Sequence, residues 1–553
     1  MDSHARMGSH RLSVLRYSDL KNILSIFFFS CLFLYFVFAP AVNLYYFGGD
    51  DYRYLFGSPS TACKLDDGFE FMLTLGRPLQ AYLDCLSFKF ANSIESMSVV
   101  RLICVLIMGI GMGLLTLHLI KLNLSIPIAF SAAGIFFLLP QAYPDILLYG
   151  AIALPFSIAL TLIAYFCLEK SYTKFNKLIT SLPIWGGVIL LICSMLAYPA
   201  TAFFFVILVL LKLLLSPVKD WEITRRQVLT ELFAFITAGI AYFIWGYYTM
   251  HYHPLTPVPA SYQLDHPNLN LFEIIKRIVF LSNVFEGQWT LSTGIETHLQ
   301  GLLTLIFISA AMIILFYKNF DYLKTSAGIK KTLEISLYVF IVLLLSVAFI
   351  LVMPSLDLLE NRVLLGRAAA CFALVFWGLI SCSLIFPSSL RQLFVFLALS
   401  VFLVIQGYQA NIISFVNALS QAHYLNLDKM AVSQYFSKNK SLQRIHFIIP
   451  KNNYPYDRFF MAYASLLPFI EKNKLEIKWC SQARGSVLAE KDNQQATINC
   501  VQDLKKGAIA ITYSYDGDEY KKTKSMLIIQ NHYLKIDPRT LNPKYINGQN
   551  ELS

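Results

Sequence analysis

The chain has 553 residues, of which 56% are hydrophobic and only 14% are charged. Because an average soluble domain has about 25% charged residues, this composition excludes an ordinary soluble protein. The formal net charge of +11 would suggest a nucleic-acid partner for a soluble protein. In a membrane protein, basic cytoplasmic loops and anionic membrane lipids account for the same charge, so we expect no nucleic-acid partner.

Eleven apolar runs are predicted to be membrane-spanning helices, because a bilayer crossing needs about 20 apolar residues whose backbone groups pair within the segment. In chain order these spans are 23–47, 99–120, 125–139, a fourth from the break at 140–145 to about 167, 183–198, 201–215, 229–250, 298–317, 333–353, 368–386 and 392–407. The basic segment 1–21 shows no small-residue cleavage site before the first span, so it is predicted to be a cytoplasmic N-terminus followed by a signal anchor.

The orientation follows from the basic residues, which gather in alternate loops. They are Lys170, Lys174, Lys177, Lys219, Arg225, Arg226, Lys318, Lys324, Lys330, Lys331 and Arg391. Cytoplasmic loops of membrane proteins carry an excess of Lys and Arg, so these loops are predicted to be cytoplasmic. The intervening loops are then external, and they cover residues 48–98, 140–145, 251–297 and 354–367. An odd number of spans places the C-terminus outside as well.

The C-terminal part, residues 411–553, is no longer membrane-like. The runs 444–450 and 507–512 are typical of buried strands bounded by turns. The expected fold is therefore an all-α polytopic membrane domain of about eleven transmembrane helices over residues 22–410. A small extracytoplasmic α/β domain over residues 411–553 follows it.

The ten cysteines agree with this layout. Six of them fall within the predicted spans, where a free thiol behaves as a small apolar group. The other four form two local pairs, Cys63 with Cys85 and Cys480 with Cys500, all on the predicted outer side. Because outer compartments are oxidising, we predict two disulfides. A zinc site is the alternative, although no histidine lies between the members of either pair.

The exit of the first span carries the strongest local signal, Gly48-Gly49-Asp50-Asp51-Tyr52-Arg53. Two glycines free the backbone to turn, and two carboxylates follow at the expected membrane–water plane. Inverting glycosyl transfer needs a carboxylate that takes a proton from the attacking hydroxyl. It also needs a cation that stabilises the departing phosphate. The alternative interpretation of the two acids is a solvated loop beside a helix.

Cationic partners are expected on the same side. Arg77 lies in Gly76-Arg77-Pro78-Leu79, which opens an amphipathic stretch through Phe90 on the membrane surface. Arg362 and Arg367 precede the tenth span. The planar fork of Arg suits phosphate, while binding to lipid headgroups is the alternative role for each. Asp145 is a candidate second acid or metal ligand, or else a solvated loop residue.

The spans themselves are nearly free of charge. Lys212 lies near a predicted cytoplasmic end, where its ammonium is expected to snorkel to the interface. Transporters usually carry ionisable residues near the middle of their spans. The pattern therefore favours chemistry at the outer surface over translocation.

The pattern Asp50-Asp51-x-Arg53 followed by Gly76-Arg77-Pro78-Leu79 resembles the first outer loop of the O-antigen glucosyltransferases of the Gtr family. These proteins look like members of the broader GT-C class of polyprenyl-phosphate-sugar-dependent transferases, and the resemblance extends over residues 22–410. It implies Asp50 or Asp51 as catalytic base and undecaprenyl-phosphate-glucose as donor. A surface polysaccharide such as O-antigen would be the acceptor, at the bacterial inner membrane. Metal dependence varies across the class, so a divalent metal is left open and no other cofactor is expected.

We assign the donor phosphate to Arg53, Arg77, Arg362 and Arg367. Three other functions remain open at this point. A polysaccharide polymerase or ligase would depend on the outer-loop arginines and not on the Asp50–Asp51 pair. A transporter or flippase would need functional polar residues inside the spans. A non-catalytic envelope assembly factor would need neither.

Overall fold

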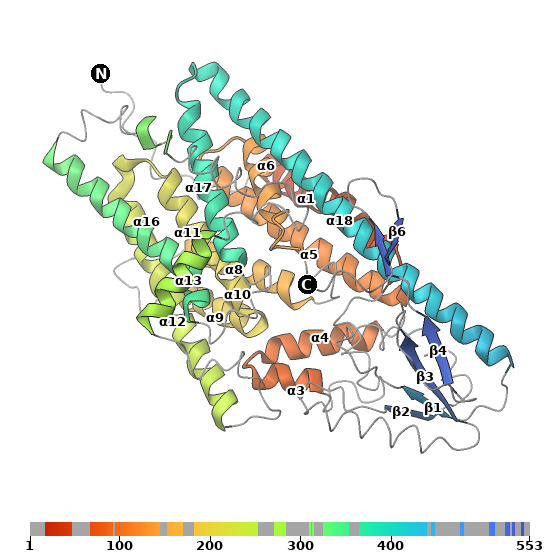
Figure 1. Cartoon of the computed structure of the whole chain (residues 1–553). Coiled ribbons are helices and arrows are strands. Elements are labelled where there is room, and N and C mark those ends of the chain that lie inside the picture. Colours follow the sequence, from red (N-terminus) through yellow and green to blue (C-terminus); the bar gives the residue numbers. More distant parts are fainter. Residues whose placement is uncertain are drawn as a thin grey trace.

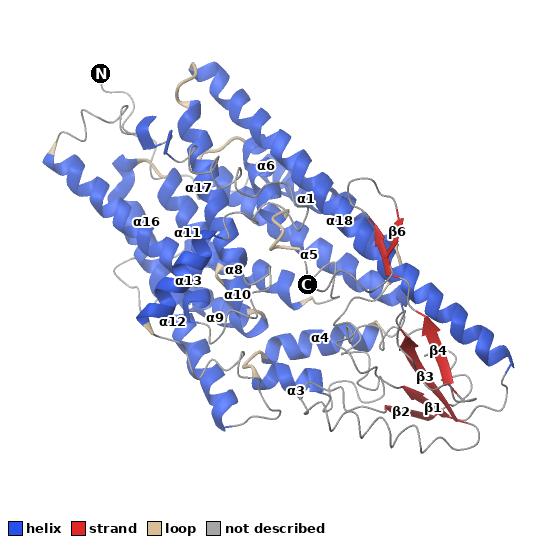
Figure 2. Ribbon diagram, viewed as in Figure 1, coloured by secondary structure: helices blue, strands red, loops and turns tan. Residues whose placement is uncertain are grey.

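The computed structural model describes a helical body and a short run of strands (Figure 2). The described residues are 17–46, 67–91, 94–143, 152–169, 182–252, 270–283, 309–310, 312–314, 325–352, 364–438, 444–447, 476–479, 508–514, 526–530, 533–536 and 543–546.

Six described helices are long and apolar enough to cross a membrane. They are α1 (Tyr17–Asn43), α5 (Ile94–Lys121), α12 (Trp221–Tyr252), α16 (Ser326–Val352), α17 (Leu365–Ser383) and α18 (Ser388–Lys438). Four shorter apolar segments accompany them: α6 (Ile126–Phe137), α8 (Ala153–Glu169), α9 (Leu182–Ala197), and α10 (Pro199–Ala202) with α11 (Phe204–Leu215). A membrane-embedded helical protein is thus supported.

The predicted count of eleven spans is only partly matched. Helices lie at ten of the eleven predicted positions, six of them long and four short. Most of the predicted eighth span, 298–317, is outside the described residues. The number of crossings therefore stays a prediction.

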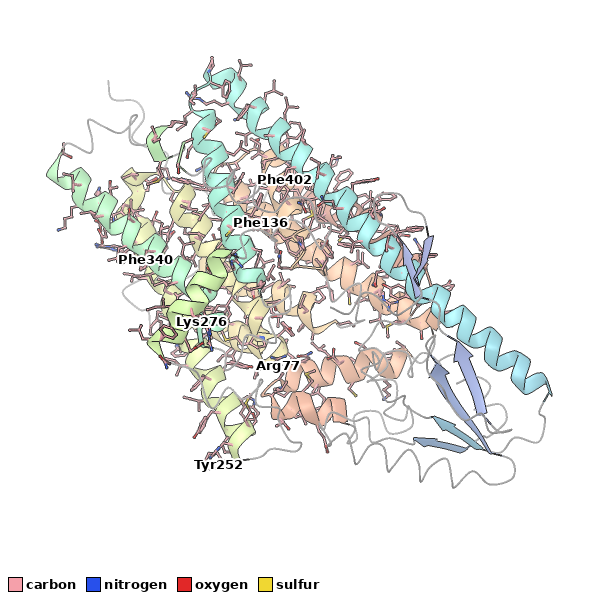
Figure 3. All side chains as sticks on the ribbon, in the orientation of Figure 1. Arg77, Phe136, Tyr252, Lys276, Phe340 and Phe402 are labelled. Atoms are coloured by element: carbon pink, nitrogen blue, oxygen red, sulfur yellow. The ribbon has the colours of Figure 1, made fainter. Side chains whose placement is uncertain are left out.

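Aromatic residues fill the centre of the helical body. The ring of Phe372 in α17 packs 4.6 Å from that of Phe136 in α6 and 6.1 Å from that of Phe402 in α18, measured between centroids. Phe136 is buried and Phe402 is partly buried against the same core; Figure 3 labels both. In contrast, Phe36, Phe340 and Val404 are apolar and exposed on the outside of the bundle. This outward apolar surface is what a hydrocarbon environment requires.

Helix α18 is much longer than a single crossing. It runs for 51 residues without a break, or about 76 Å at 1.5 Å per residue. No Gly or Pro occurs between Tyr408 and Lys438 to end it, so the helix continues through the predicted domain boundary at 410–411. Its C-terminal half contacts strands β4 and β5, beside which it lies in Figure 1.

The strands follow α18. Four of them, β1 (Arg444–Phe447), β2 (Glu476–Trp479), β3 (Ala508–Ser514) and β4 (Met526–Gln530), form a parallel sheet in the order β2-β1-β3-β4. A second pair, β5 (Tyr533–Ile536) and β6 (Pro543–Ile546), is antiparallel. The two runs predicted as strands overlap β1 and β3. The crossover connections that parallel strands need lie outside the described residues, so the α/β domain as a unit stays a prediction.

The expectation that Lys212 snorkels to the interface is wrong. Lys212 in α11 is only 4% exposed and forms an ion pair with the fully buried Glu231 of α12. Its ammonium also lies 4.8 Å from the centroid of the Tyr165 ring. A buried ammonium needs a counter-charge, and a neighbouring helix supplies one here.

Further ion pairs lie near the same end of the helices. Lys121, the last residue of α5, pairs with Glu169, the last residue of α8. On α12, Arg225 pairs with Glu334 of α16 at 2.9 Å. Lys121 is about 40 Å along α5 from Ile94, at 1.5 Å per residue. These pairs therefore link the helices far from α4 (Pro78–Phe90), which directly precedes α5.

Candidate functional site

A helical hairpin lies across the other end of the bundle. It consists of α3 (Asp67–Thr74) and α4 (Pro78–Phe90), both within the predicted outer loop 48–98. Helix α4 contacts α8 and α9, and α3 contacts α12. Figure 1 shows the hairpin below these helices, at the same end of the molecule as the C-terminal end of α12 and the strands.

The Gly76-Arg77-Pro78 segment has a defined structural role at the turn of this hairpin. The N–H of Gly76 donates to Leu73 O at 3.0 Å and the N–H of Arg77 donates to Met72 O at 2.9 Å. This is the hydrogen-bond pattern of a Schellman motif, in which the helix ends on a left-handed residue. Gly76 has φ +71°, and a Cβ on it would lie 2.7 Å from the Cα of Gly246 in α12. Pro78 then opens α4 at its first position.

This turn directs Arg77 towards the bundle. The guanidinium carbon lies 5.2 Å from the centroid of the Tyr198 ring, a cation–π distance. The buried phenol of Tyr242 in α12 also lies near the guanidinium, and its hydroxyl has no hydrogen-bond partner among the described residues. Nε of Arg77 is buried and has no hydrogen-bond partner among the described residues. Figure 3 shows Arg77 between the hairpin and the bundle. A cation therefore lies at this end of the helices, and its Nε–H can still donate a hydrogen bond.

Tyr198 is placed by a break between α9 and α10. Pro199 lacks an N–H and begins α10 at its first position, so the helix is interrupted there. Ser157 of α8 contacts the carbonyl of Tyr198 at 3.1 Å, and Thr201 contacts it at 3.0 Å. Ser194 joins the same buried group of hydroxyls, 2.8 Å from that of Ser157. These side chains satisfy the interrupted backbone and hold the Tyr198 ring under Arg77.

Helix α4 buries its polar face. Gln80, Asp84 and Ser87 are buried against the bundle, with Asp84 at 0% exposure. On the opposite face, Tyr82 and Leu86 are exposed, at 59% and 52%. The amphipathic stretch predicted from the sequence is thus a helix. Its apolar face points outward, as expected for contact with lipid, and its polar face covers the end of the bundle.

Arg101 is a residue that sequence reasoning missed. It lies in α5, inside the predicted second span, and its side chain is fully buried. Nη1 donates to Tyr46 O at 2.8 Å and the guanidinium carbon lies 3.7 Å from the centroid of the Tyr46 ring. From the same side of α5, Ser98 donates to Val42 O. These contacts bind backbone carbonyls in the last turn of α1 and just beyond it, and Tyr46 lies four residues before Asp50. The sequence feature that could have identified Arg101 is the presence of an arginine three residues inside an apolar run.

Arg367 lies in the first turn of α17 and is 4% exposed. The preceding Gly366 packs closely on two neighbours: a Cβ there would lie 2.7 Å from Ser346 O and 3.5 Å from the Cβ of Phe203. Because Phe203 follows α10 directly, the start of α17 lies beside the break between α9 and α11, which Arg77 approaches from α4. The structure thus brings the first turn of α17, which carries Arg367, to the region of Arg77.

The other predicted site residues lie outside the described part of the chain. They are Asp50, Asp51, Arg53, Asp145, Arg362, Cys63, Cys480 and Cys500. Cys85 in α4 is disulfide-bonded, and its predicted pairing with Cys63 stays a prediction. The six cysteines expected within spans are not disulfide-bonded: Cys31, Cys104, Cys167, Cys193, Cys371 and Cys382.

The described residues include no group of three or more His, Cys, Asp or Glu side chains that could hold a metal ion. The candidate acids are outside that search, so a divalent metal stays open. Just before the predicted acid Asp145, Tyr143 is buried and packs 5.4 Å from Phe38, measured between ring centroids. Burial raises the pKa of the Tyr143 phenol, which keeps this ring neutral.

Comparison with protein-family models gives no match for this chain, and comparison with curated proteins gives none either. The arrangement of Arg77, Arg367, Arg101 and the polar face of α4 is therefore the basis for assigning a function.

Proposed function

We propose that the chain is a membrane glycosyltransferase with a lipid-linked donor. It moves a hexose from an undecaprenyl-phosphate carrier to a surface polysaccharide such as O-antigen, and the resemblance of its outer-loop motif suggests glucose. The observation that carries this proposal is Arg77, a partly buried cation at the end of an apolar bundle. Tyr198 and Tyr242 flank it, and Nε is without a partner among the described residues. A lipid phosphate is an anion that can reach such a position from within the membrane.

The reaction is an inverting displacement. A carboxylate of Asp50 or Asp51 takes the proton of an acceptor hydroxyl, whose oxygen attacks the anomeric carbon of the donor sugar. The bond between that carbon and the phosphate oxygen breaks, and undecaprenyl phosphate leaves with the bonding electrons. Arg77 and Arg367 stabilise the negative charge that develops on this phosphate. Arg101 contributes by fixing the backbone at Tyr46, from which the Asp50–Asp51 segment continues.

We further propose that the hairpin end of the bundle faces the periplasm, with the bacterial inner membrane as the location. The basic loops then lie in the cytoplasm together with the N-terminus, and the strands lie outside. Reporter fusions after Ser388 should read cytoplasmic, and fusions after Lys438 should read periplasmic. The reverse pattern at both positions would remove the catalytic role from the α3–α4 end.

A polymerase or ligase with the same kind of carrier is the second candidate. It is favoured by the fact that the described ligands are arginines, which such an enzyme would also use. The buried Lys212–Glu231 pair is the kind of feature that a transporter would need. However, Lys212 is three residues from the end of α11, and its partner balances its charge. This placement fits a link between helices better than a pathway.

One assay separates these functions. Purified protein is given undecaprenyl-phosphate-[14C]glucose and a lipopolysaccharide acceptor. The proposal predicts a glucosylated acceptor, with one undecaprenyl phosphate released per glucose transferred. Transfer of a whole preassembled glycan would identify a ligase. Movement of intact donor between leaflets, with no new linkage, would identify a transporter.

A further inference from the structure

The buried face of α4 continues the site beyond Arg77. Gln80 and Asp84 are four residues apart in α4, so they share one face of the helix, and Arg77 is the N-cap residue that precedes them. We call the stretch from Arg77 through Gln80 to Asp84 the strip. At 1.5 Å per residue it is about 10 Å long, a length comparable with that of a phosphohexose. Arg77 stands at the end of the strip where α4 begins.

The strip is polar where an apolar surface would have been sufficient to attach the hairpin to the bundle. Gln80 is 6% exposed, and its Oε1 has no hydrogen-bond partner among the described residues. A buried amide oxygen without a partner costs free energy, so its retention calls for a reason. Ser87, one turn beyond Asp84, differs because its hydroxyl bonds Leu83 O within the same helix at 2.7 Å. Ser87 therefore needs no outside ligand and marks the end of the strip.

The chemistry of these two side chains suits a sugar. An amide offers both donors and an acceptor, whereas an ionised carboxylate accepts only. Neighbouring hydroxyls of a hexose each donate and accept, so one amide and one carboxylate can bind them together. A cation, an amide and a carboxylate in that order match a phosphate followed by a ring of hydroxyls.

We propose that the buried face of α4 is the hexose subsite of the donor. Gln80 and Asp84 bind hydroxyls of the sugar whose phosphate lies at Arg77, and they thereby determine which sugar is accepted. This inference rests on the proposed function, because it takes a lipid-phosphate sugar as the ligand. It adds two specificity-determining residues that are independent of the Asp50–Asp51 pair.

The test compares two lipids, undecaprenyl-phosphate-glucose and undecaprenyl phosphate, by their affinities for the purified full chain. The wild type should bind the glucosylated lipid more tightly. Gln80→Leu and Asp84→Asn should each weaken binding of the glucosylated lipid roughly five- to tenfold, the effect of losing one hydrogen bond. Affinity for undecaprenyl phosphate should stay within about twofold. Leu86→Ala, on the exposed face of α4, is the matched control and should change neither affinity.

A second variant keeps the test decisive if Gln80→Leu is not recovered as folded protein. Gln80→Asn retains the amide but shortens it, so it should lose part of the preference for the glucosylated lipid. The affinities for donors carrying glucose, galactose or N-acetylglucosamine are also compared. If Gln80 had only a structural role, its substitution would leave the order of these affinities unchanged. The Gln80 variants should change the order of preference among these sugars.

Several results would overturn the inference. One is that Gln80→Leu and Asp84→Asn both keep the wild-type ratio of affinities for the two lipids. Another is a wild-type chain that binds both lipids equally. A third is an unchanged donor affinity with a raised KM for the acceptor, which would make the strip an acceptor site. The proposed transfer reaction is tested separately by turnover of the Asp50 and Asp51 variants, so either claim can fail alone.

Discussion

Arg77 and Gly76 have separate roles that substitutions can distinguish. Arg77→Lys keeps the charge but removes the planar fork and its stacking on Tyr198. We expect affinity for undecaprenyl phosphate to fall about tenfold, because one charge-assisted hydrogen bond is lost. The matched control is Arg391→Lys at the start of α18, where the exposed side chain bonds Phe386 O. If Arg77→Ala kept wild-type donor affinity and turnover, the phosphate would bind elsewhere.

Gly76 is expected to be a stability residue. Gly76→Ala places a Cβ in the left-handed region and 2.7 Å from the Cα of Gly246. The left-handed conformation alone costs about 1–2 kcal/mol, so a lower thermal midpoint in detergent is expected. Gly239→Ala in α12 is the control, because nothing lies within 4 Å of its added Cβ and helix propensity favours Ala. Equal midpoints for the two variants would contradict the close approach of α3–α4 to α12.

Some residues of the site could be predicted and others could not. Arg77 was found because its motif is local, with Gly and Pro on either side of it. The packing of Gly76 against Gly246 could not be found, since the two are distant in sequence and only the fold brings them together. Arg101 was overlooked because one charge barely changes the hydropathy of a long apolar run. Its role depends on Tyr46, which lies just beyond the end of α1 and is distant in sequence.

At the scale of helices, the Lys212–Glu231 pair links α11 to α12 inside the bundle. Lys212→Met leaves the carboxylate of Glu231 buried without its counter-charge, and we expect a loss of about 3–5 kcal/mol in unfolding free energy. The double variant Lys212→Met/Glu231→Gln should recover most of that loss, because no isolated charge remains. Unfolding in detergent measures both. A single variant as stable as the wild type would mean that the pair has no structural role.

Helix positions were the most predictable elements, because long apolar runs specify helices in a bilayer whatever their neighbours are. Which face of a helix points inward was less predictable. The amphipathic character of α4 is evident in the sequence, but which face points inward depends on the bundle it covers. The length of α18 was not predicted, for a related reason. Hydropathy falls after residue 407, while the helix itself continues because no residue breaks it.

At the scale of the whole molecule, the two predicted disulfides report on the compartment of the hairpin and the strands. Cys85 lies in α4, and Cys480 and Cys500 belong to the C-terminal part. Peptide mapping without reduction should recover Cys63–Cys85 and Cys480–Cys500 cross-linked, as expected on the oxidising side of the membrane. In reduced samples the cross-linked peptides should separate. Free thiols at all four positions in membrane-inserted protein would place these regions on the reducing side.

The central claim is that Asp50 or Asp51 is the catalytic base of a glycosyl transfer at the α3–α4 end. The most direct measurement is the initial rate and the donor affinity of Asp50→Asn, Asp51→Asn and the double variant, each checked for membrane insertion. Replacing the base should lower turnover by roughly 10²–10⁴-fold, the usual contribution of general-base catalysis. Donor affinity should persist, because the carboxylate acts on the acceptor proton. Near-normal turnover in all three variants would contradict the mechanism and favour the arginine-dependent ligase.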